Sequence, residues 1–378
     1  MPATAFTGAD VFDGAVLHRG HALLVEGGAV AAIVPRVPPG AEVVRLEGGI
    51  LAPGMIDLQV NGGGGWQVGG DATPARFAAM AAAHARLGAT GILPTLITDT
   101  AQATARVVEA GIAAARAEVP GFLGLHLEGP HLDPRRKGAH DPALIRPMGD
   151  GDLALLARAA AALPCLMVTL APAAVTPMQI AALARAGVVV SLGHADCSHA
   201  EALEARAAGA RVVTHLFNAM SPLSHREPGL AGAALAGAFA AGLIADGVHV
   251  VPEVLRVVLA ARAEGVFLVS DAMAFAGTDL AEMALGGRRI LRRDGRLTLA
   301  DGTLAGADLS LPQAVAVLVA AAGAAPARAL AMATSVPAAV AGLAGRAGHL
   351  APGRAADMVH LGPDYSLRGV WRAGVSAL

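Results

Sequence analysis

Three residues of the types that ligate metals in proteins follow short apolar stretches of this chain. Glu128 ends the stretch LGLHLE, His194 follows VVVSLG, and His215 follows RVVT. A fourth stretch, VFLVS, leads into Asp271. Two imidazoles and a carboxylate hold zinc with one position left open, and a further carboxylate beside that position can manage a proton. The pattern predicts a metal-dependent hydrolase.

Each of these four residues also has an ordinary structural alternative. A single histidine in an apolar stretch more often satisfies hydrogen bonds in the core. Glu128 can cap a helix or form a salt bridge, and Asp271 can cap the segment after it. The Gly129-Pro130 pair makes a cap at Glu128 less natural. Two histidines at corresponding ends of adjacent predicted strands favour a metal site with Glu128 as the third ligand.

Basic residues recur in the loops after the predicted strands. His140 lies in RRKGAH, Arg226 in SHREPG and His249 in ADGVH. A solvated loop is the ordinary place for an arginine, and an exposed histidine needs no function. Basic groups gathered on one rim, however, suit an anionic substrate.

The elements that must position these residues alternate between strand and helix. Continuous apolar strands separated by Ala-rich amphipathic segments are typical of a parallel sheet buried on both faces. The eight candidate strands cover residues 50–60, 88–96, 121–129, 165–172, 187–195, 210–218, 242–250 and 265–273. Eight such units predict a (β/α)8 TIM-like barrel with the polar residues at its C-terminal rim.

An open, doubly wound sheet is the alternative architecture. It is the weaker one because no GxGxxG follows the first strand and the polar strand ends are spread over many strands. The glycine run 61–65 lacks the GK[ST] ending of a phosphate loop. Both ends of the chain show short β-like stretches broken by Gly and Pro. We therefore expect residues 1–50 and 348–378 to form a small β-sandwich domain and residues 51–347 to form the catalytic barrel.

Composition limits the remaining possibilities. The chain has 378 residues, 54% of them hydrophobic and 15% charged, with a formal net charge of −2. No basic stripe is present, so nucleic acid is not an expected partner. No uncharged apolar run reaches the ~18 residues of a membrane span, and the first residues lack the basic region and apolar core that are typical of a signal peptide. Two cysteines without a CxxC pair fit a reducing compartment. We expect a cytoplasmic protein without a membrane partner.

Eight characteristic stretches run in order from about residue 51 to 274: LAPGMIDLQVNGGGG, GATGILPTLIT, GLHLEGPHLDPRRKGAH, VTLAP, VSLGHADCS, THLFNAMSPLSHREPG, ADGVHV and LVSDAM. HLEGPH and THLFNAM are the most specific of these motifs. Taken together, the stretches resemble the amidohydrolase superfamily and, within it, the N-acetylglucosamine-6-phosphate deacetylases. GHLAPGRAADMV near the C-terminus is similar to a return strand of the family's β-sandwich.

This resemblance implies a role for each candidate residue. Asp271 would activate water and then protonate the leaving amine, and His140 would polarise the acetyl carbonyl. The implied metal ligands are Glu128, His194 and His215. The implied contacts to the sugar phosphate are His249, the backbone at Asn218 and Ala219, and Arg226. In the family the arginine comes from the neighbouring subunit, which implies a homodimer.

The first and fourth predicted strands indicate how many metal ions the site binds. Gln59-Val60-Asn61 stands where many amidohydrolases carry HxH, and amide side chains are poor zinc ligands. The fourth strand has no lysine that could be carboxylated to bridge two metals. We expect one divalent ion per subunit, zinc. Ala173 departs from the glutamate that relatives often carry after VTLAP.

The resemblance implies deacetylation of N-acetylglucosamine 6-phosphate to glucosamine 6-phosphate and acetate. The same chemistry on N-acetylgalactosamine 6-phosphate is the nearest alternative, since the two sugars differ in one hydroxyl configuration. A catalytically silent barrel that binds a sugar phosphate is a third reading. Such a protein would be marked by loss of Asp271 or of a ligand, and here all of them are present.

Overall fold

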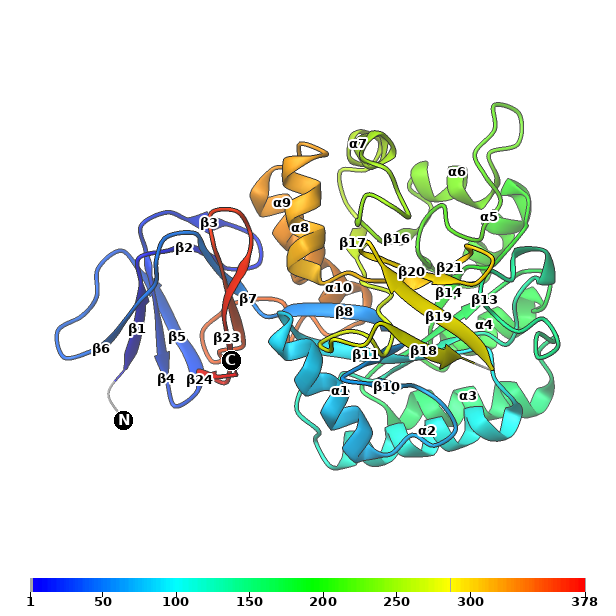
Figure 1. The fold of residues 1–378 in the computed structure, drawn as a ribbon, viewed down its shortest axis with the longest axis horizontal. Helices are drawn as coiled ribbons and strands as arrows, with labels where there is room; N and C mark the ends of the chain where they lie inside the picture. The colour runs from blue at the N-terminus through cyan, green and yellow to red at the C-terminus, as the bar shows by residue number, and fades with distance from the viewer. Residues whose placement is uncertain (1–2, 286, 378) are drawn as a thin grey trace.

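The computed structural model describes residues 3–285 and 287–377 and contains a parallel-stranded barrel with a smaller β domain beside it (Figure 1). Eight parallel strands form the barrel sheet in the order β17-β16-β15-β14-β13-β12-β11-β8. Their bounds are Met55–Val60 (β8), Ala89–Ile97 (β11), Leu125–Glu128 (β12), Leu166–Leu170 (β13), Val189–Leu192 (β14), Val212–Val213 (β15), Ala240–Leu243 (β16) and Val266–Leu268 (β17). Nearly every residue of these strands is buried, as parallel strands covered by helices require. The expected (β/α)8 barrel is confirmed.

The first and last strands of the sheet meet and close the barrel next to Asp271. The N–H of Asp271 donates to the carbonyl of Gln59 at 3.1 Å, and the N–H of Asn61 donates to the carbonyl of Ala272 at 2.8 Å. The buried carboxylate of Asp57 accepts the N–H of Ser270 at 3.2 Å. Closure therefore places the ends of β8 and β17 side by side on the rim.

Helices follow the strands and pack on the outside of the barrel (Figure 1). Polar caps define several of their starts: Thr100 caps α2, and Ser198 caps α5 in a capping box with Glu201. The helices are α1 (Pro74–Arg86), α2 (Ala101–Arg116), α3 (Asp150–Ala162), α4 (Pro177–Arg185), α5 (His199–Ala208), α6 (Gly229–Leu235), α7 (Pro252–Ala261), α8 (Leu311–Ala320), α9 (Pro326–Ala333) and α10 (Ser335–Val340). None of the described helices is both long enough and apolar enough to cross a bilayer.

The small domain combines the two ends of the chain, as expected for a β-sandwich made from both termini. One sheet has the order β5-β4-β1-β6 and the other the order β24-β23-β22-β7-β2-β3. The first sheet comprises Thr4–Thr7 (β1), Ala22–Glu26 (β4), Ala29–Val34 (β5) and Glu42–Arg45 (β6). The second comprises Asp10–Phe12 (β2), Leu17–His18 (β3), Ile50–Pro53 (β7), Met358–Leu361 (β22), Leu367–Arg372 (β23) and Val375–Ser376 (β24). The predicted first barrel strand is thus divided, since β7 belongs to this domain and β8 to the barrel.

A four-stranded antiparallel sheet after the last barrel strand was not predicted from the sequence. It comprises Glu282–Leu285 (β18), Arg288–Arg293 (β19), Arg296–Leu299 (β20) and Leu304–Ala307 (β21). The N–H of Ala307 donates to the carbonyl of Asp271 at 2.9 Å, which docks β21 on the barrel rim. This sheet lies across the barrel, drawn in yellow in Figure 1.

Candidate metal centre and active site

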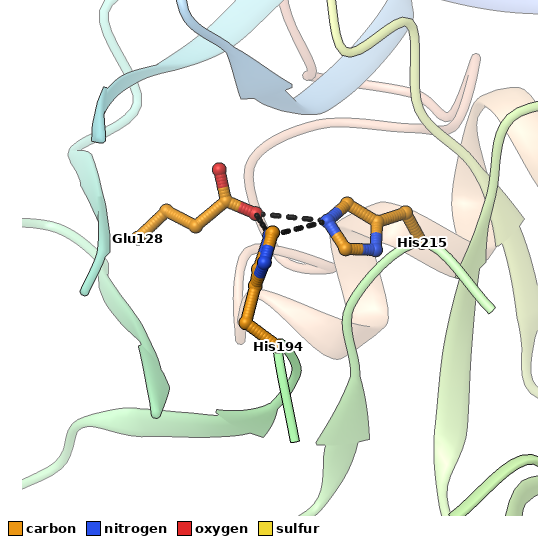
Figure 2. Close-up of side chains that lie close together, drawn as sticks. All are labelled: Glu128, His194 and His215. Atoms are coloured by element: carbon orange, nitrogen blue, oxygen red, sulfur yellow. Dashed lines mark hydrogen bonds and ion pairs between the residues drawn. The ribbon is translucent and has the colours of Figure 1, made fainter. Parts of the chain in front are cut away.

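Glu128, His194 and His215 converge at the C-terminal rim of the barrel (Figure 2). Glu128 ends β12, and the two histidines follow β14 and β15. The Nε2 atoms of His215 and His194 lie 3.0 and 3.4 Å from Glu128 Oε1, and 3.1 Å from each other. All three side chains are buried. Parallel strands thus bring together residues separated by up to 87 positions in the sequence.

The surroundings prepare His194 and Glu128 to act as ligands. His194 Nδ1 lies 2.8 Å from the carbonyl oxygen of Arg136, so Nδ1 donates its proton and Nε2 keeps a lone pair toward the cluster. Burial alone would raise the pKa of Glu128. Hydrogen bonds and charge interactions with His194 and His215 outweigh it and hold that pKa well below its usual range. An ionised carboxylate and imidazole nitrogens form a donor set that fits a divalent ion of the zinc type.

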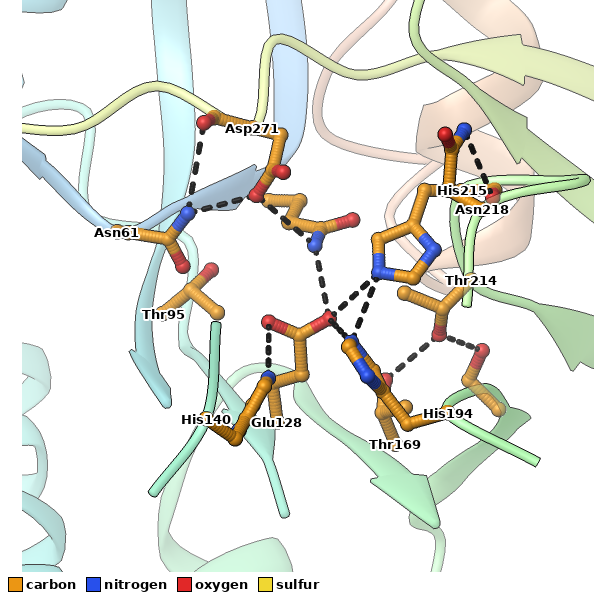
Figure 3. Close-up of polar contacts among 12 residues, drawn as sticks. Asn61, Thr95, Glu128, His140, Thr169, His194, Thr214, His215, Asn218 and Asp271 are labelled. Atoms are coloured by element: carbon orange, nitrogen blue, oxygen red, sulfur yellow. Dashed lines mark hydrogen bonds and ion pairs between the residues drawn. The ribbon is translucent and has the colours of Figure 1, made fainter. Parts of the chain in front are cut away.

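Two amide side chains donate hydrogen bonds to Asp271, and one of them, Gln59, also contacts Glu128. Figure 3 shows the other, Asn61, directed toward Asp271. Gln59 Nε2 donates to Glu128 Oε1 at 3.0 Å and to Asp271 Oδ1 at 3.1 Å. Asn61 Nδ2 donates to the same oxygen of Asp271 at 2.6 Å. Amide N–H groups have no lone pair for a metal, so the amide atoms that face Glu128 and Asp271 are hydrogen-bond donors. Both amides contact Oδ1 of Asp271, and neither contacts Oδ2.

Asp271 is buried beside the cluster, three residues after the end of β17. Burial raises its pKa to about 6, with a further contribution from the negative charge of Glu128. Its φ angle is 51°, and His194 and His215 have φ angles of 46° and 28°. Left-handed backbone is uncommon for residues with a side chain and is concentrated at functional sites. A carboxylate with this raised pKa can exchange protons near neutral pH.

His140 approaches the cluster from the loop after β12. Its Nε2 lies 3.7 Å from Glu128 Oε2, and its Nδ1 contacts Thr98. Burial, together with the neighbouring His194, lowers the pKa of His140 to about 3, so the ring is neutral. A neutral imidazole can donate a hydrogen bond without bringing a second charge to the site.

A cavity of about 240 Å³ opens over these groups. It takes in eight of the nine residues predicted from the sequence. Its predicted lining residues are Glu128, His140, His194, His215, Asn218, Ala219, His249 and Asp271, and its further lining residues are Asn61, Ile97, Gly138, Ala139, Ile244, Met273 and residues 303–306. Arg226 is the exception, because it lies exposed on the loop before α6, outside the lining of its own chain's cavity. Ala173 is also exposed and does not line the cavity.

His249 is held in the cavity by a buried carboxylate. Its Nδ1 lies 2.6 Å from Asp246 Oδ2, while Asp246 Oδ1 accepts the N–H groups of Val248 and His249. Burial would raise the pKa of Asp246, but these contacts lower it overall, so the carboxylate stays ionised. The N–H of Asn218 donates to the carbonyl of His215 at 2.9 Å, within the turn that carries Ala219.

Several residues of the site were missed by reasoning from the sequence. Thr98 and Asp246 lie inside the motifs GATGILPTLIT and ADGVHV, so a search for hydrogen-bond partners of His140 and His249 within those motifs could have found them. The amides of Gln59 and Asn61 were considered only as poor metal ligands. Residues 303–306 belong to the unpredicted sheet, and no local pattern marks them as lining the cavity.

Comparisons with known proteins identify the family of this chain. Residues 50–376 match the model of the Amidohydrolase family. The chain is 38% identical over 334 residues to N-acetylgalactosamine-6-phosphate deacetylase from Shewanella sp. (strain ANA-3), which covers 87% of this chain and 84% of that protein. It is 30% identical over 365 residues to N-acetylglucosamine-6-phosphate deacetylase from Haemophilus influenzae, with 93% of both chains covered.

Solved structures extend the similarity to the whole fold. The crystal structure of N-acetylglucosamine-6-phosphate deacetylase from Pasteurella multocida superposes with a TM-score of 0.94 at 31% identity, covering 99% of both chains. The match includes the small domain as well as the barrel. The chain therefore belongs to the amidohydrolase family and, within it, to the hydrolytic deacetylases of N-acetylated amino-sugar 6-phosphates.

Proposed function

We propose that this protein hydrolyses N-acetylglucosamine 6-phosphate to glucosamine 6-phosphate and acetate. One observation carries the proposal: a single cavity is lined by the cluster of Glu128, His194 and His215 and also by Asp271 and His140. A metal-binding triad, a proton carrier and a neutral hydrogen-bond donor are the groups that amide hydrolysis needs.

One divalent ion, zinc, is the cofactor that we propose, with Glu128, His194 and His215 as its protein ligands. When bound, the ion supplies positive charge that polarises the amide carbonyl and lowers the pKa of water. The hydrogen bond from His194 Nδ1 to the carbonyl of Arg136 orients that ring toward the ion. Gln59 and Asn61 build no second site, because their amide nitrogens are turned to Glu128 and Asp271.

Asp271 is the proposed general base and acid. Its ionised carboxylate removes a proton from the attacking water, and the protonated carboxyl then returns that proton to the departing amine nitrogen. Hydrogen bonds from Gln59 and Asn61 to Oδ1 fix the carboxylate while Oδ2 is left for the reaction. His140 donates a hydrogen bond to the acyl oxygen as negative charge develops there.

The phosphate group is proposed to bind at His249, Asn218, Ala219 and Arg226. The first three line the cavity, whereas Arg226 is exposed on its loop. We infer that this guanidinium enters the cavity of a second copy, because a guanidinium can bind a phosphate with two hydrogen bonds. We accordingly propose a homodimer in which each arginine completes the partner's site. The two unpaired cysteines and the net charge of −2 support a cytoplasmic enzyme that does not bind nucleic acid.

N-acetylgalactosamine 6-phosphate is a second candidate substrate. It is favoured by two relatives named for that sugar, at 38% and 35% identity. Both candidates require the same metal centre and base, so the choice rests on contacts to one hydroxyl group.

The test is steady-state kinetics of acetate release from the two 6-phosphates and from unphosphorylated N-acetylglucosamine. The proposal expects the highest kcat/KM on N-acetylglucosamine 6-phosphate and a large loss when the phosphate is missing. Higher kcat/KM on the galacto epimer would transfer the assignment to the second candidate. No acetate release from any of the three, in protein that has been loaded with metal, would contradict both candidates.

A further inference from the structure

Three histidines of the cavity differ in what their Nδ1 atoms contact. His194 Nδ1 faces the carbonyl oxygen of Arg136 at 2.8 Å, and His249 Nδ1 faces the carboxylate of Asp246 at 2.6 Å. Both partners are acceptors, so each of these Nδ1 atoms carries a proton. Nδ1 of His140 instead faces the backbone N–H of Thr98 at 3.2 Å. The Nδ1 atom of His140 therefore faces a hydrogen-bond donor, whereas the Nδ1 atoms of His194 and His249 face acceptors.

A backbone N–H can only donate, and this fixes the protonation of the His140 ring. Its Nδ1 must present a lone pair to Thr98, so the single proton of the neutral ring lies on Nε2. The hydroxyl of Thr98 lies 2.7 Å from the same Nδ1 and donates to it as well. Nε2–H then faces the cavity, on the side of Glu128 Oε2. Figure 3 shows the Nε2 side of this ring turned toward Glu128.

The neighbouring backbone is shaped to hold the Thr98 hydroxyl. A Cβ atom on Gly129 would lie 2.3 Å from Thr98 Oγ1, closer than two such atoms can approach. Gly129 has a φ angle of 92° and directly follows the ligand Glu128. A residue without a side chain thus leaves room for the hydroxyl between the cluster and His140. Thr98 itself is 6% exposed and follows the end of β11.

We propose that Thr98 is a positioning residue that makes His140 a hydrogen-bond donor directed into the cavity. The inference rests on the proposed function, in which that donor stabilises the developing charge on the acyl oxygen. Thr98 touches neither substrate nor metal and acts through the ring of His140. No proton leaves Nε2 in this role, so the catalytic proton remains with Asp271.

Two substitutions at Thr98 test the positioning role. Thr98→Val keeps the branched shape and the backbone N–H but removes the hydroxyl, and Thr98→Ser keeps the hydroxyl. Because partners that orient active-site histidines typically contribute tenfold or more, we expect Thr98→Val to lower kcat about tenfold. KM and metal content should stay near wild type, and Thr98→Ser should recover most of the loss.

Thr104→Val is the matched control. Thr104 is also buried, and it lies in α2, where its hydroxyl donates to the carbonyl of the capping residue Thr100, away from the cavity. The control should keep wild-type kcat. Equal losses of kcat in Thr98→Val and Thr104→Val, or wild-type kcat in Thr98→Val, would overturn the role of Thr98.

The tautomer of the His140 ring can be measured directly by NMR, without substrate. Long-range proton–nitrogen NMR spectra of metal-loaded protein labelled at the histidine rings distinguish a protonated Nε2 from a protonated Nδ1, and His140→Gln identifies the signals. We expect His140 to carry its proton on Nε2, and a proton on Nδ1 would overturn the inference. If this tautomer is present but the wild type releases no acetate, the proposed function fails while the assignment of the ring stands.

Discussion

The cavity has two walls of different construction. The barrel rim supplies Glu128, His194, His215 and Asp271 from the ends of parallel strands, and polar contacts link these side chains to one another or to neighbouring amides. The opposite wall, residues 303–306, comes from the β18–β21 sheet and offers one hydroxyl, that of Thr303, among small and apolar groups. The rim can carry out chemistry, whereas this wall can only confine and orient a substrate.

The two walls are nevertheless connected. The N–H of Ala307 donates to the carbonyl of Asp271 at 2.9 Å, and Arg288 Nη2 donates to the carbonyl of Ala139 at 2.5 Å, next to His140. A Cβ on Gly306 would lie 2.7 Å from the carbonyl oxygen of Asp271, so only glycine permits this close approach. The wall therefore supports the backbone at Asp271 and at Ala139, the residue before His140. This division predicts that rim substitutions destroy turnover and wall substitutions reduce it modestly.

The largest effect is expected from removing a metal ligand on the rim. His194→Ala should lose bound metal and lower kcat/KM by at least about 10³-fold, because several kcal/mol of charge stabilisation disappear with the ion. Elemental analysis and acetate release measure the two losses. Wild type stripped with a chelator should be restored by zinc, and His21→Ala in the small domain should leave both quantities unchanged. Full activity in metal-free His194→Ala would contradict the metal site.

The next largest effect is expected at Asp271, the proposed general base. Asp271→Asn keeps the shape of the side chain but cannot accept a proton, so kcat should fall by at least about 10²-fold. Metal content should remain near one ion per chain, because Asp271 is outside the triad of ligands. Near wild-type turnover in the Asn variant would remove Asp271 from the mechanism.

The raised pKa of Asp271 predicts how kcat/KM depends on pH. Its pKa is about 6, and only the ionised form can act as a base. Activity should therefore be complete above pH 7 and fall as pH decreases through 6, approaching tenfold per pH unit. A profile of kcat/KM against pH from 5 to 8 checks this, with metal content measured at each end. The residual activity of Asp271→Asn should lack this acidic decline.

The rim was predictable from the sequence because each of its residues ends a local apolar pattern. Glu128, His194, His215 and Asp271 all stand directly at or just after a strand, and parallel strands bring such ends together. The motifs also included His140 and His249. Their roles in catalysis and binding are still predictions.

The wall was not predictable in this way. Its docking contacts join residues far apart in the sequence, such as Arg288 to Ala139 across 149 positions. Strands such as RLTL and LAGA have only four residues, too few for their alternation to predict a strand, and their packing decides their conformation. The same reason hides the hydrogen bonds of Gln59, whose partners Glu128 and Asp271 lie 69 and 212 positions away.

The smallest effect is expected on the wall, and β19 provides a matched pair to measure it. Arg288 donates to the carbonyl of Ala139, whereas its neighbour Arg289 is exposed and pairs with Glu282 at the surface. Arg288→Ala removes one half-buried hydrogen bond that steadies the loop carrying His140. At about 1 kcal/mol for such a bond, kcat/KM should fall about fivefold, with metal content unchanged.

Arg289→Ala should have almost no effect, since exposed ion pairs contribute little. The comparison is informative because the two variants remove the same charge from adjacent residues of one strand. A loss from Arg288→Ala as large as that from Asp271→Asn would mean that the wall takes part in the chemistry. Identical kinetics for Arg288→Ala, Arg289→Ala and wild type would mean that the wall does not support the His140 loop, and the cavity would then depend on the barrel rim alone.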